Sequence, residues 1–199
     1  MKSGLKLPQV YRKLKTPEAI QLFLDDCAYN TDPVVRAPVD VAVVKKAHCM
    51  DGALFAAAGL WKIGFQPIVM DLRAVHDDDH VLAIFKAKGC WGAVAKSNYS
   101  GLRYREPVYR TLRELAISYF ENYFNLKRER TLREYSVPLN LKKRWHDRWI
   151  YTNEMYDDIS QALDDIRHYD LISRAQEQSL TRVDRRSFLA GSVGRLKSY

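Results

Sequence analysis

Residues 46–60 read KAHCMDGALFAAAGL, and this stretch organises the rest of the chain. The pattern predicts a helix that begins near Cys49, runs to about residue 60 or 62 and stops at Gly64. Its small residues, Ala53 and the run at 56–59, let neighbouring backbone approach the helix closely. A cysteine in the first turn lies at the positive end of the helix dipole, which favours the thiolate and lowers the thiol pKa. Cys49 is therefore the candidate nucleophile.

The composition is that of a packed globular protein. Of 199 residues, 47% are apolar and 12% aromatic, which argues against disorder. We expect one domain over residues 1–170 and a basic, polar, poorly ordered tail over residues 171–199. No apolar run reaches the roughly 18 residues that a membrane span needs, so we expect no membrane partner.

The cysteine count and the charge bear on the compartment and the partners of the protein. Three cysteines without a paired spacing form neither a disulfide framework nor a zinc motif. Reduced thiols and the lack of a signal-peptide core predict a cytoplasmic protein. The net charge of +8 permits a nucleic acid or another anionic partner without establishing one. We expect neither a cofactor nor a metal.

Hydrophobic periodicity predicts an α+β fold, in which a small antiparallel sheet lies between helices. Thr16 and Pro17 predict the start of the first helix. The expected elements are a helix at 17–29, an irregular approach at 33–45, the Cys49 helix, strands at 66–72, 80–85 and 90–95 with a hairpin turn at 86–89, a helix with an aromatic stripe at 108–124, a charged segment at 126–148 and a last helix at 155–166.

His80 is the candidate general base. It opens a predicted strand 31 residues after Cys49. Nucleophilic acyl transfer by cysteine requires a base within hydrogen-bond reach of the thiol and a third group that orients the base. A helix followed by a hairpin is a layout that would bring these groups together.

The residues around this pair resemble the transglutaminase-like, papain-like cysteine superfamily over about residues 40–100. The similarity lies in His48–Ala53 with Gly64 and Val69 downstream, and in Asp79-His80-Val81 followed by Trp91. It implies a papain-like core in which a nucleophile helix packs on the sheet, with Cys49 as nucleophile and His80 as general base and acid. Members include peptidases, amidases, protein crosslinkers and acyltransferases, so the substrate stays open.

The third catalytic residue departs from the family pattern. The superfamily places an aspartate about four residues after the strand tryptophan, whereas this chain has Ala95, Lys96, Ser97 and Asn98 there. We predict Asn98 as the group that orients His80, with Ser97 as the second choice. Asn98 needs a bulge or a strand end to turn inward, because strand side chains alternate between faces.

The aspartates at 77–79, beside His76 and His80, allow two interpretations. A metal site is conceivable, but adjacent carboxylates rarely all face one ion, so we favour a solvated acidic loop. We also expect the field of these carboxylates to raise the His80 pKa and favour a thiolate–imidazolium pair.

Near the nucleophile, Asp51 and His48 point away from Cys49, and we expect a structural role for both. The Cys49 N–H is one expected donor to an oxyanion. The second donor stays open, with Tyr29 and Asn30 as weak candidates.

Arg103 and Arg105 follow the predicted site and could select an anionic group on a substrate. The alternative is a surface loop paired with Glu106. Trp91, on the third strand, completes the predicted substrate-binding set. Cys27 and Cys90 are expected to be inert core cysteines.

Two functions of different class remain. The first is a cysteine-dependent hydrolase or acyltransferase that acts on a peptide, amide or ester through a Cys49 thioester. The second is an inactive binding module that contacts a nucleic acid or other anionic partner through the basic segment 127–148. Tyr135, Trp145 and Trp149 would stack on bases in that case, although Trp145 and Trp149 are also spaced to pack inward.

Overall fold

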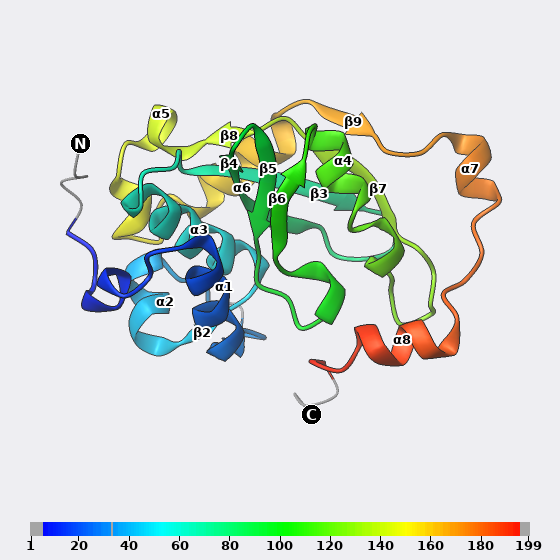
Figure 1. The fold of residues 1–199 in the computed structure, drawn as a ribbon, viewed down its shortest axis with the longest axis horizontal. Helices are drawn as coiled ribbons and strands as arrows, with labels where there is room; N and C mark the ends of the chain where they lie inside the picture. The colour runs from blue at the N-terminus through cyan, green and yellow to red at the C-terminus, as the bar shows by residue number, and fades with distance from the viewer. Residues whose placement is uncertain (1–5, 33, 196–199) are drawn as a thin grey trace.

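A seven-stranded antiparallel sheet forms the centre of the protein (Figure 1). The computed structural model describes residues 6–32 and 34–195. In chain order, with η for a 3-10 helix, the elements are η1 (Gln9–Arg12), α1 (Pro17–Asp26), β1 (Ala28–Tyr29), α2 (Pro38–Val44), β2 (Lys46–Ala47), α3 (Cys49–Lys62), β3 (Ile68–Ala74), β4 (His80–Ala87), β5 (Cys90–Val94), η2 (Ser100–Leu102), β6 (Arg105–Tyr109), α4 (Leu112–Ile117), η3 (Phe120–Asn122), β7 (Leu132–Ser136), β8 (Leu139–Asn140), α5 (Leu141–Trp145), η4 (Arg148–Ile150), α6 (Tyr156–Asp165), β9 (His168–Asp170), α7 (Arg174–Gln178) and α8 (Arg185–Gly191). The strand order is β6-β5-β4-β3-β7-β9, and β8 also pairs with β3. The predicted α+β class is confirmed.

Helix α3 is the buried helix that the sequence predicts. Every residue from Met50 to Leu60 is buried, and α1, α2 and β4 pack around the helix. Beyond its end, Gly64 adopts a positive φ of 103° and the Phe65 N–H donates to the Leu60 carbonyl. A glycine in this conformation ends a helix without the steric cost that a Cβ would bring.

Two glycines let other elements approach α3. A Cβ added at Gly52 would lie 2.3 Å from Cβ of Lys96, in the segment after β5. A Cβ added at Gly59 would meet Cδ1 of Ile20, in α1, at 2.9 Å. The first contact is with an atom fixed to the backbone, whereas the second is with the end of a side chain that can rotate.

Gly52→Ala is therefore expected to lower the free energy of unfolding by about 1–3 kcal/mol through overpacking. Gly59→Ala is the matched control in the same helix, because its Ile20 neighbour can move and alanine gains about 1 kcal/mol of helix propensity over glycine. Urea unfolding of both variants measures the difference. Equal stability of the two variants would contradict the close approach at Gly52.

The central hairpin has a tighter turn than expected. Ala87 pairs with Cys90, and Lys88 and Gly89 both adopt positive φ, 50° and 82°. Two residues with positive φ are typical of a type I′ turn, whose twist matches that of the strands. The strand β4 therefore extends two residues beyond its predicted end.

Side chains of β4 alternate between two hydrophobic cores. Val81, Ala83 and Phe85 belong to a first core with α1, α3 and α6. Leu82 and Ile84 belong to a second core with α4 and η3. Both faces of the strand are thus buried, which explains its nearly continuous apolar sequence.

Two expectations about secondary structure are wrong. Residues 38–44 form a helix, because Pro38 at its first turn already has helical φ. The predicted helix at 108–124 is divided into β6, α4 and η3, since residues 105–109 pair with β5. The charged segment at 126–148 contains β7, which pairs with β3. The helix α6 and strands β3 and β5 lie close to their predicted positions.

The segment after residue 170 forms an arm of two helices that packs on the body, contrary to the expected poorly ordered tail. Figure 1 shows the chain leaving β9 through α7 and returning at α8. Val183 is 1% exposed and donates its N–H to the Arg128 carbonyl. The Phe188 ring lies 5.6 Å from that of Phe124, between centroids. Residues 1–5 and 196–199, which the domain prediction also includes, lie outside the described residues.

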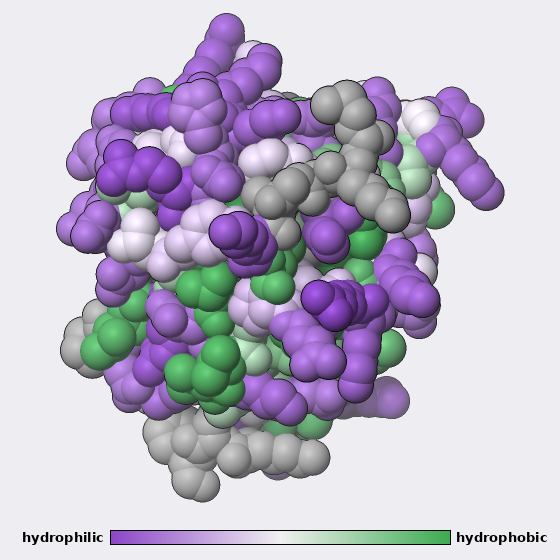
Figure 2. Space-filling model, turned by 90° about the vertical axis from the view of Figure 1, so that its left-hand side faces the viewer, coloured by the Kyte–Doolittle hydropathy of each residue, from purple (hydrophilic) through white to green (hydrophobic). Residues whose placement is uncertain are grey.

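Hydrophilic side chains cover most of the end of the molecule at which α2 and α5 lie, and apolar ones form small separate groups there (Figure 2). Val43 and Val44 of α2 are among the exposed apolar residues. Among the described residues, none of the helices has both the length and the apolar character required to cross a membrane.

Candidate active site

The start of α3 is fixed by a capping box. His48 Nδ1 accepts hydrogen bonds from the N–H groups of Met50 (3.1 Å) and Asp51 (3.5 Å). The Asp51 carboxylate in turn accepts from the His48 N–H and the Arg36 N–H. Because Nδ1 accepts, it carries no proton, and burial lowers the pKa of His48. Both residues therefore have the structural role that we expected.

Cys49, the first residue of α3, lies at a cleft of about 710 Å³ that His80 also lines. The residues that line the cleft come from segments far apart in the sequence. Its lining consists of Tyr29, Asn30 and Thr31; His48 and Cys49; Asp77, Asp78, Asp79 and His80; Ser97, Asn98, Tyr99 and Leu102; and Tyr123, Phe124, Tyr156 and Arg195. The two residues predicted to carry the chemistry thus share one cleft.

His80 is held by a backbone carbonyl. Its Nε2 lies 2.8 Å from the Leu102 oxygen, and a carbonyl can only accept, so Nε2 carries the proton. The basic lone pair is then on Nδ1. The ring also packs edge-on against Tyr123, with centroids 6.3 Å apart. Burial lowers the pKa of His80 to about 4, and the Arg105 charge acts in the same direction.

The Cys49 thiol donates to the Asp79 carbonyl, 3.8 Å away. Burial raises its pKa to about 11, against hydrogen bonds from the backbone of Val81 and Met50. The carboxylates of Asp71 and Asp51 raise it further. The pKa of Cys49 is therefore raised overall, and the expectation that its place at the helix start would lower this pKa is wrong. The expected rise of the His80 pKa is wrong as well. At neutral pH the resting site holds a thiol and a neutral imidazole.

The free protein should consequently show slow alkylation of Cys49 at pH 6, with a rate that keeps rising through pH 10. The thiolate is the reactive form, and its fraction grows with pH until the pKa near 11 is passed. Iodoacetamide labelling followed by peptide mass spectrometry measures the rate at each pH. A plateau reached between pH 6 and 7 would show a thiolate–imidazolium pair in the free protein instead.

Residues 77–79 form separate hydrogen bonds with different parts of the protein. Asp77 accepts from the Thr131 hydroxyl at 2.8 Å, and Asp79 accepts from the Ala74 N–H at 2.7 Å. The Tyr123 hydroxyl donates to the Asp78 carbonyl. No group of three or more metal-ligating side chains converges anywhere in residues 6–32 and 34–195.

Leu102, and not Asn98, provides the acceptor for His80. The register of β4 with β5 places Ala83 opposite Val94, and β5 ends there, so that strand does not extend as far as His80. Asn98 lines the cleft, and its carbonyl packs against Gly194 in the C-terminal arm. The Ser97 hydroxyl oxygen accepts a hydrogen bond from the Tyr99 N–H. A carbonyl leaves no signal in the sequence, which is why this partner could not be predicted.

Asn98→Ala is expected to leave the pH dependence of Cys49 alkylation unchanged, because Nε2 of His80 keeps its bond to Leu102. The same labelling series measures it. A shifted profile would mean that Asn98 turns toward His80 in solution.

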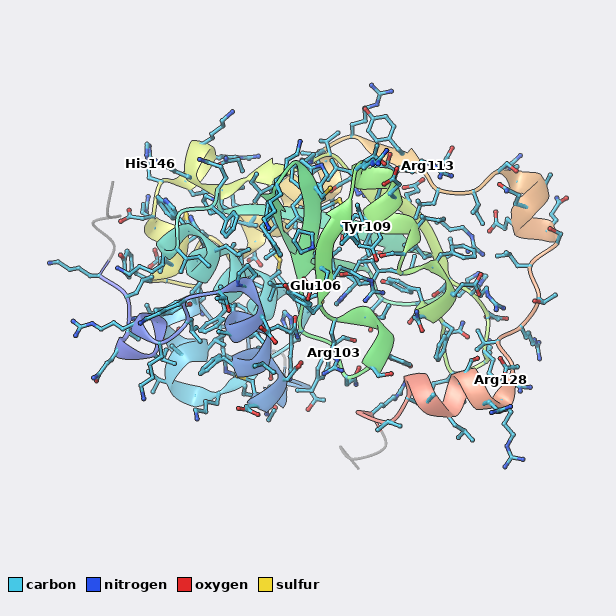
Figure 3. All side chains as sticks on the ribbon, in the orientation of Figure 1. Arg103, Glu106, Tyr109, Arg113, Arg128 and His146 are labelled. Carbon is cyan, nitrogen blue, oxygen red and sulfur yellow. The ribbon has the colours of Figure 1, made fainter. Side chains whose placement is uncertain are left out.

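The predicted substrate-binding residues lie away from this cleft. Arg103, which is labelled in Figure 3, follows η2 directly. It forms an ion pair with Asp25 at 2.9 Å and lines a neighbouring pocket. Arg105 donates to the Gly101 and Ser118 carbonyls and covers the Tyr119 ring. Arg105 is therefore a half-buried side chain that links the start of β6 to Gly101 and to the end of α4.

Trp91 and the remaining cysteines also lie outside the cleft lining. Trp91 pairs with Tyr109 near the hairpin turn, under the Lys86 ammonium group. Cys27 is buried at the end of α1, whereas Cys90 is half-buried beside the turn. All three cysteines are free thiols.

A second buried polar pair lies on the α3 side of the sheet. His168 Nε2 is 3.1 Å from the Asp71 carboxylate, and Nδ1 is 2.8 Å from the Ile166 carbonyl. Burial raises the pKa of Asp71 to about 6, with Asp79 adding to the rise and His168 opposing it. Residue 71 pairs with Val81 in the sheet. No local sequence pattern marks this pair, because its members lie 97 residues apart.

Part of the basic segment 127–148 makes internal contacts, whereas Lys127, Lys143 and Arg148 are exposed. Trp145 and Trp149 are 5% and 1% exposed, so both indoles pack inward. Arg130, Arg133 and Arg144 pair with Glu121, Glu177 and Asp158.

A scan of protein-family models and a search of curated proteins found no match to this chain.

Proposed function

We propose that this protein is a cysteine-dependent acyl-transfer enzyme, a hydrolase or acyltransferase acting on a peptide, amide or ester, with a papain-like core of the transglutaminase-like type. The observation that carries the proposal is the shared cleft of Cys49 and His80, with the imidazole tautomer fixed by Leu102. A free thiol suits a reducing compartment such as the cytoplasm.

In the first step the Cys49 sulfur bonds to the carbonyl carbon of the substrate, and its proton passes to Nδ1 of His80. The π electrons of the carbonyl move to its oxygen, which forms an oxyanion. Because both groups are neutral at rest, proton transfer accompanies the attack and does not precede it. The thiol must turn from the Asp79 carbonyl toward His80 for this step.

In the second step the oxyanion collapses to a thioester, and the leaving group takes the proton from the His80 imidazolium. His80 then removes a proton from water or from an acceptor nucleophile, which attacks the thioester. Cys49 departs as the thiol after receiving the proton back. Every proton transfer thus takes place at Nδ1 of His80, while Nε2 keeps its hydrogen bond to the Leu102 carbonyl.

The experiment uses p-nitrophenyl acetate as the acyl donor and intact-protein mass spectrometry as the readout. Cys49→Ala should abolish acetylation, and His80→Gln should slow it by about 10²-fold or more, the usual contribution of a general base. Cys90→Ala is the matched control, because it removes a half-buried thiol outside the cleft.

Acetylation of Cys90, or a Cys49→Ala variant that is acylated at the wild-type rate, would overturn the proposal. Circular dichroism of each variant shows whether it folds. A library of peptide amides and esters, with Cys49→Ala as control, then identifies the substrate class.

A further inference from the structure

The hydrogen bonds at the start of α3 point to a second donor for the oxyanion. His48 Nδ1 accepts from two backbone N–H groups, so the neutral imidazole carries its proton on Nε2. The Tyr156 hydroxyl lies 3.3 Å from Nε2, and Asp51 Oδ1 lies 3.5 Å from it. The phenol oxygen of Tyr156 therefore accepts from His48.

Tyr156 then has its own O–H hydrogen left to donate. No acceptor for it lies among the described residues of the chain, and the side chain lines the Cys49 cleft. Burial raises the pKa of Tyr156, and a charge on Cys49 raises it further, so the phenol stays protonated. An accepted hydrogen bond also polarises the O–H group and strengthens it as a donor.

The other candidates fit less well. The Asn30 amide donates to the Val34 carbonyl and the Asp51 carboxylate. The Tyr123 hydroxyl donates to the Asp78 carbonyl. Tyr29 lines the cleft, but no group among the described residues holds its hydroxyl in place. Donors that are fixed before the reaction stabilise an oxyanion most, because no reorganisation is needed.

We propose that Tyr156 is a catalytic residue that, together with the Cys49 N–H, donates a hydrogen bond to the oxyanion formed at Cys49, and that His48 positions its hydroxyl. The inference rests on the proposed acyl transfer. The Cys49 N–H is one of the donors that a helix start leaves without an intrahelical partner. One helix start would thus provide the nucleophile, a backbone donor and, through its cap, a side-chain donor.

The test compares two reagents on the same thiol. Acetylation by p-nitrophenyl acetate passes through an oxyanion, whereas alkylation by iodoacetamide is a direct displacement at carbon and forms none. Tyr156→Phe should slow acetylation of Cys49 by about 10²-fold, the loss typical of one oxyanion donor, and leave the alkylation rate unchanged. Tyr104→Phe, a phenol outside the cleft lining, is the matched control for both reagents.

Equal slowing of both reactions in Tyr156→Phe would show a structural role and overturn the inference. Unchanged acetylation would overturn it as well, as would a selective loss in Tyr29→Phe in place of Tyr156→Phe. Failure of the proposed function looks different, because the wild-type protein would then not be acetylated at Cys49 at all.

Discussion

The buried carboxylate of Asp51 is the interaction on which the site depends. It is fully buried and accepts hydrogen bonds from the Asn30 amide and from the N–H groups of Arg36 and His48. A buried carboxylate without such partners would cost several kcal/mol. Its partners therefore bind the segment after β1, the approach to α2 and the start of α3 to one point. Cys49 and Tyr29 are immediate neighbours of residues in this network.

Burial controls the chemistry of the thiol more than the helix does. A helix N-terminus favours an anion, but that effect is modest and acts against the desolvation of a thiolate in a protein interior. At Cys49 two nearby carboxylates add to the cost, and the resting thiol stays protonated. His80, enclosed with Tyr123 and Leu102, loses basicity for the same reason.

The sequence predicts those parts of the fold that depend on local patterns. Helix α3, its glycine stop and the β4–β5 hairpin all follow from periodicity and turn residues near one another in the chain. The division of 105–124 and the strand β7 follow from pairing with β5 and β3, which local pattern does not encode. For the site, the order of Cys49 and His80 predicts the shared cleft. Leu102 contacts His80 through its backbone carbonyl, which no sequence motif marks. Tyr156 contacts His48, which lies 108 residues away in the chain, and it belongs to no motif either.

The alternation of β4 divides the cleft between the two hydrophobic cores. Cys49 belongs to the layer of α3, whereas the His80 ring lies with Tyr123 and Leu102 of the second core, in which α4 and η3 cover the other face of the sheet. Small units of a protein can open locally at a lower free energy than the whole. A local opening of the second core, in which α4 moves away from the sheet, would release the His80 imidazole and leave α3 intact. Cys49 and His80 are thus held by different cores, and we expect the cleft to stay assembled only under conditions in which both cores remain packed.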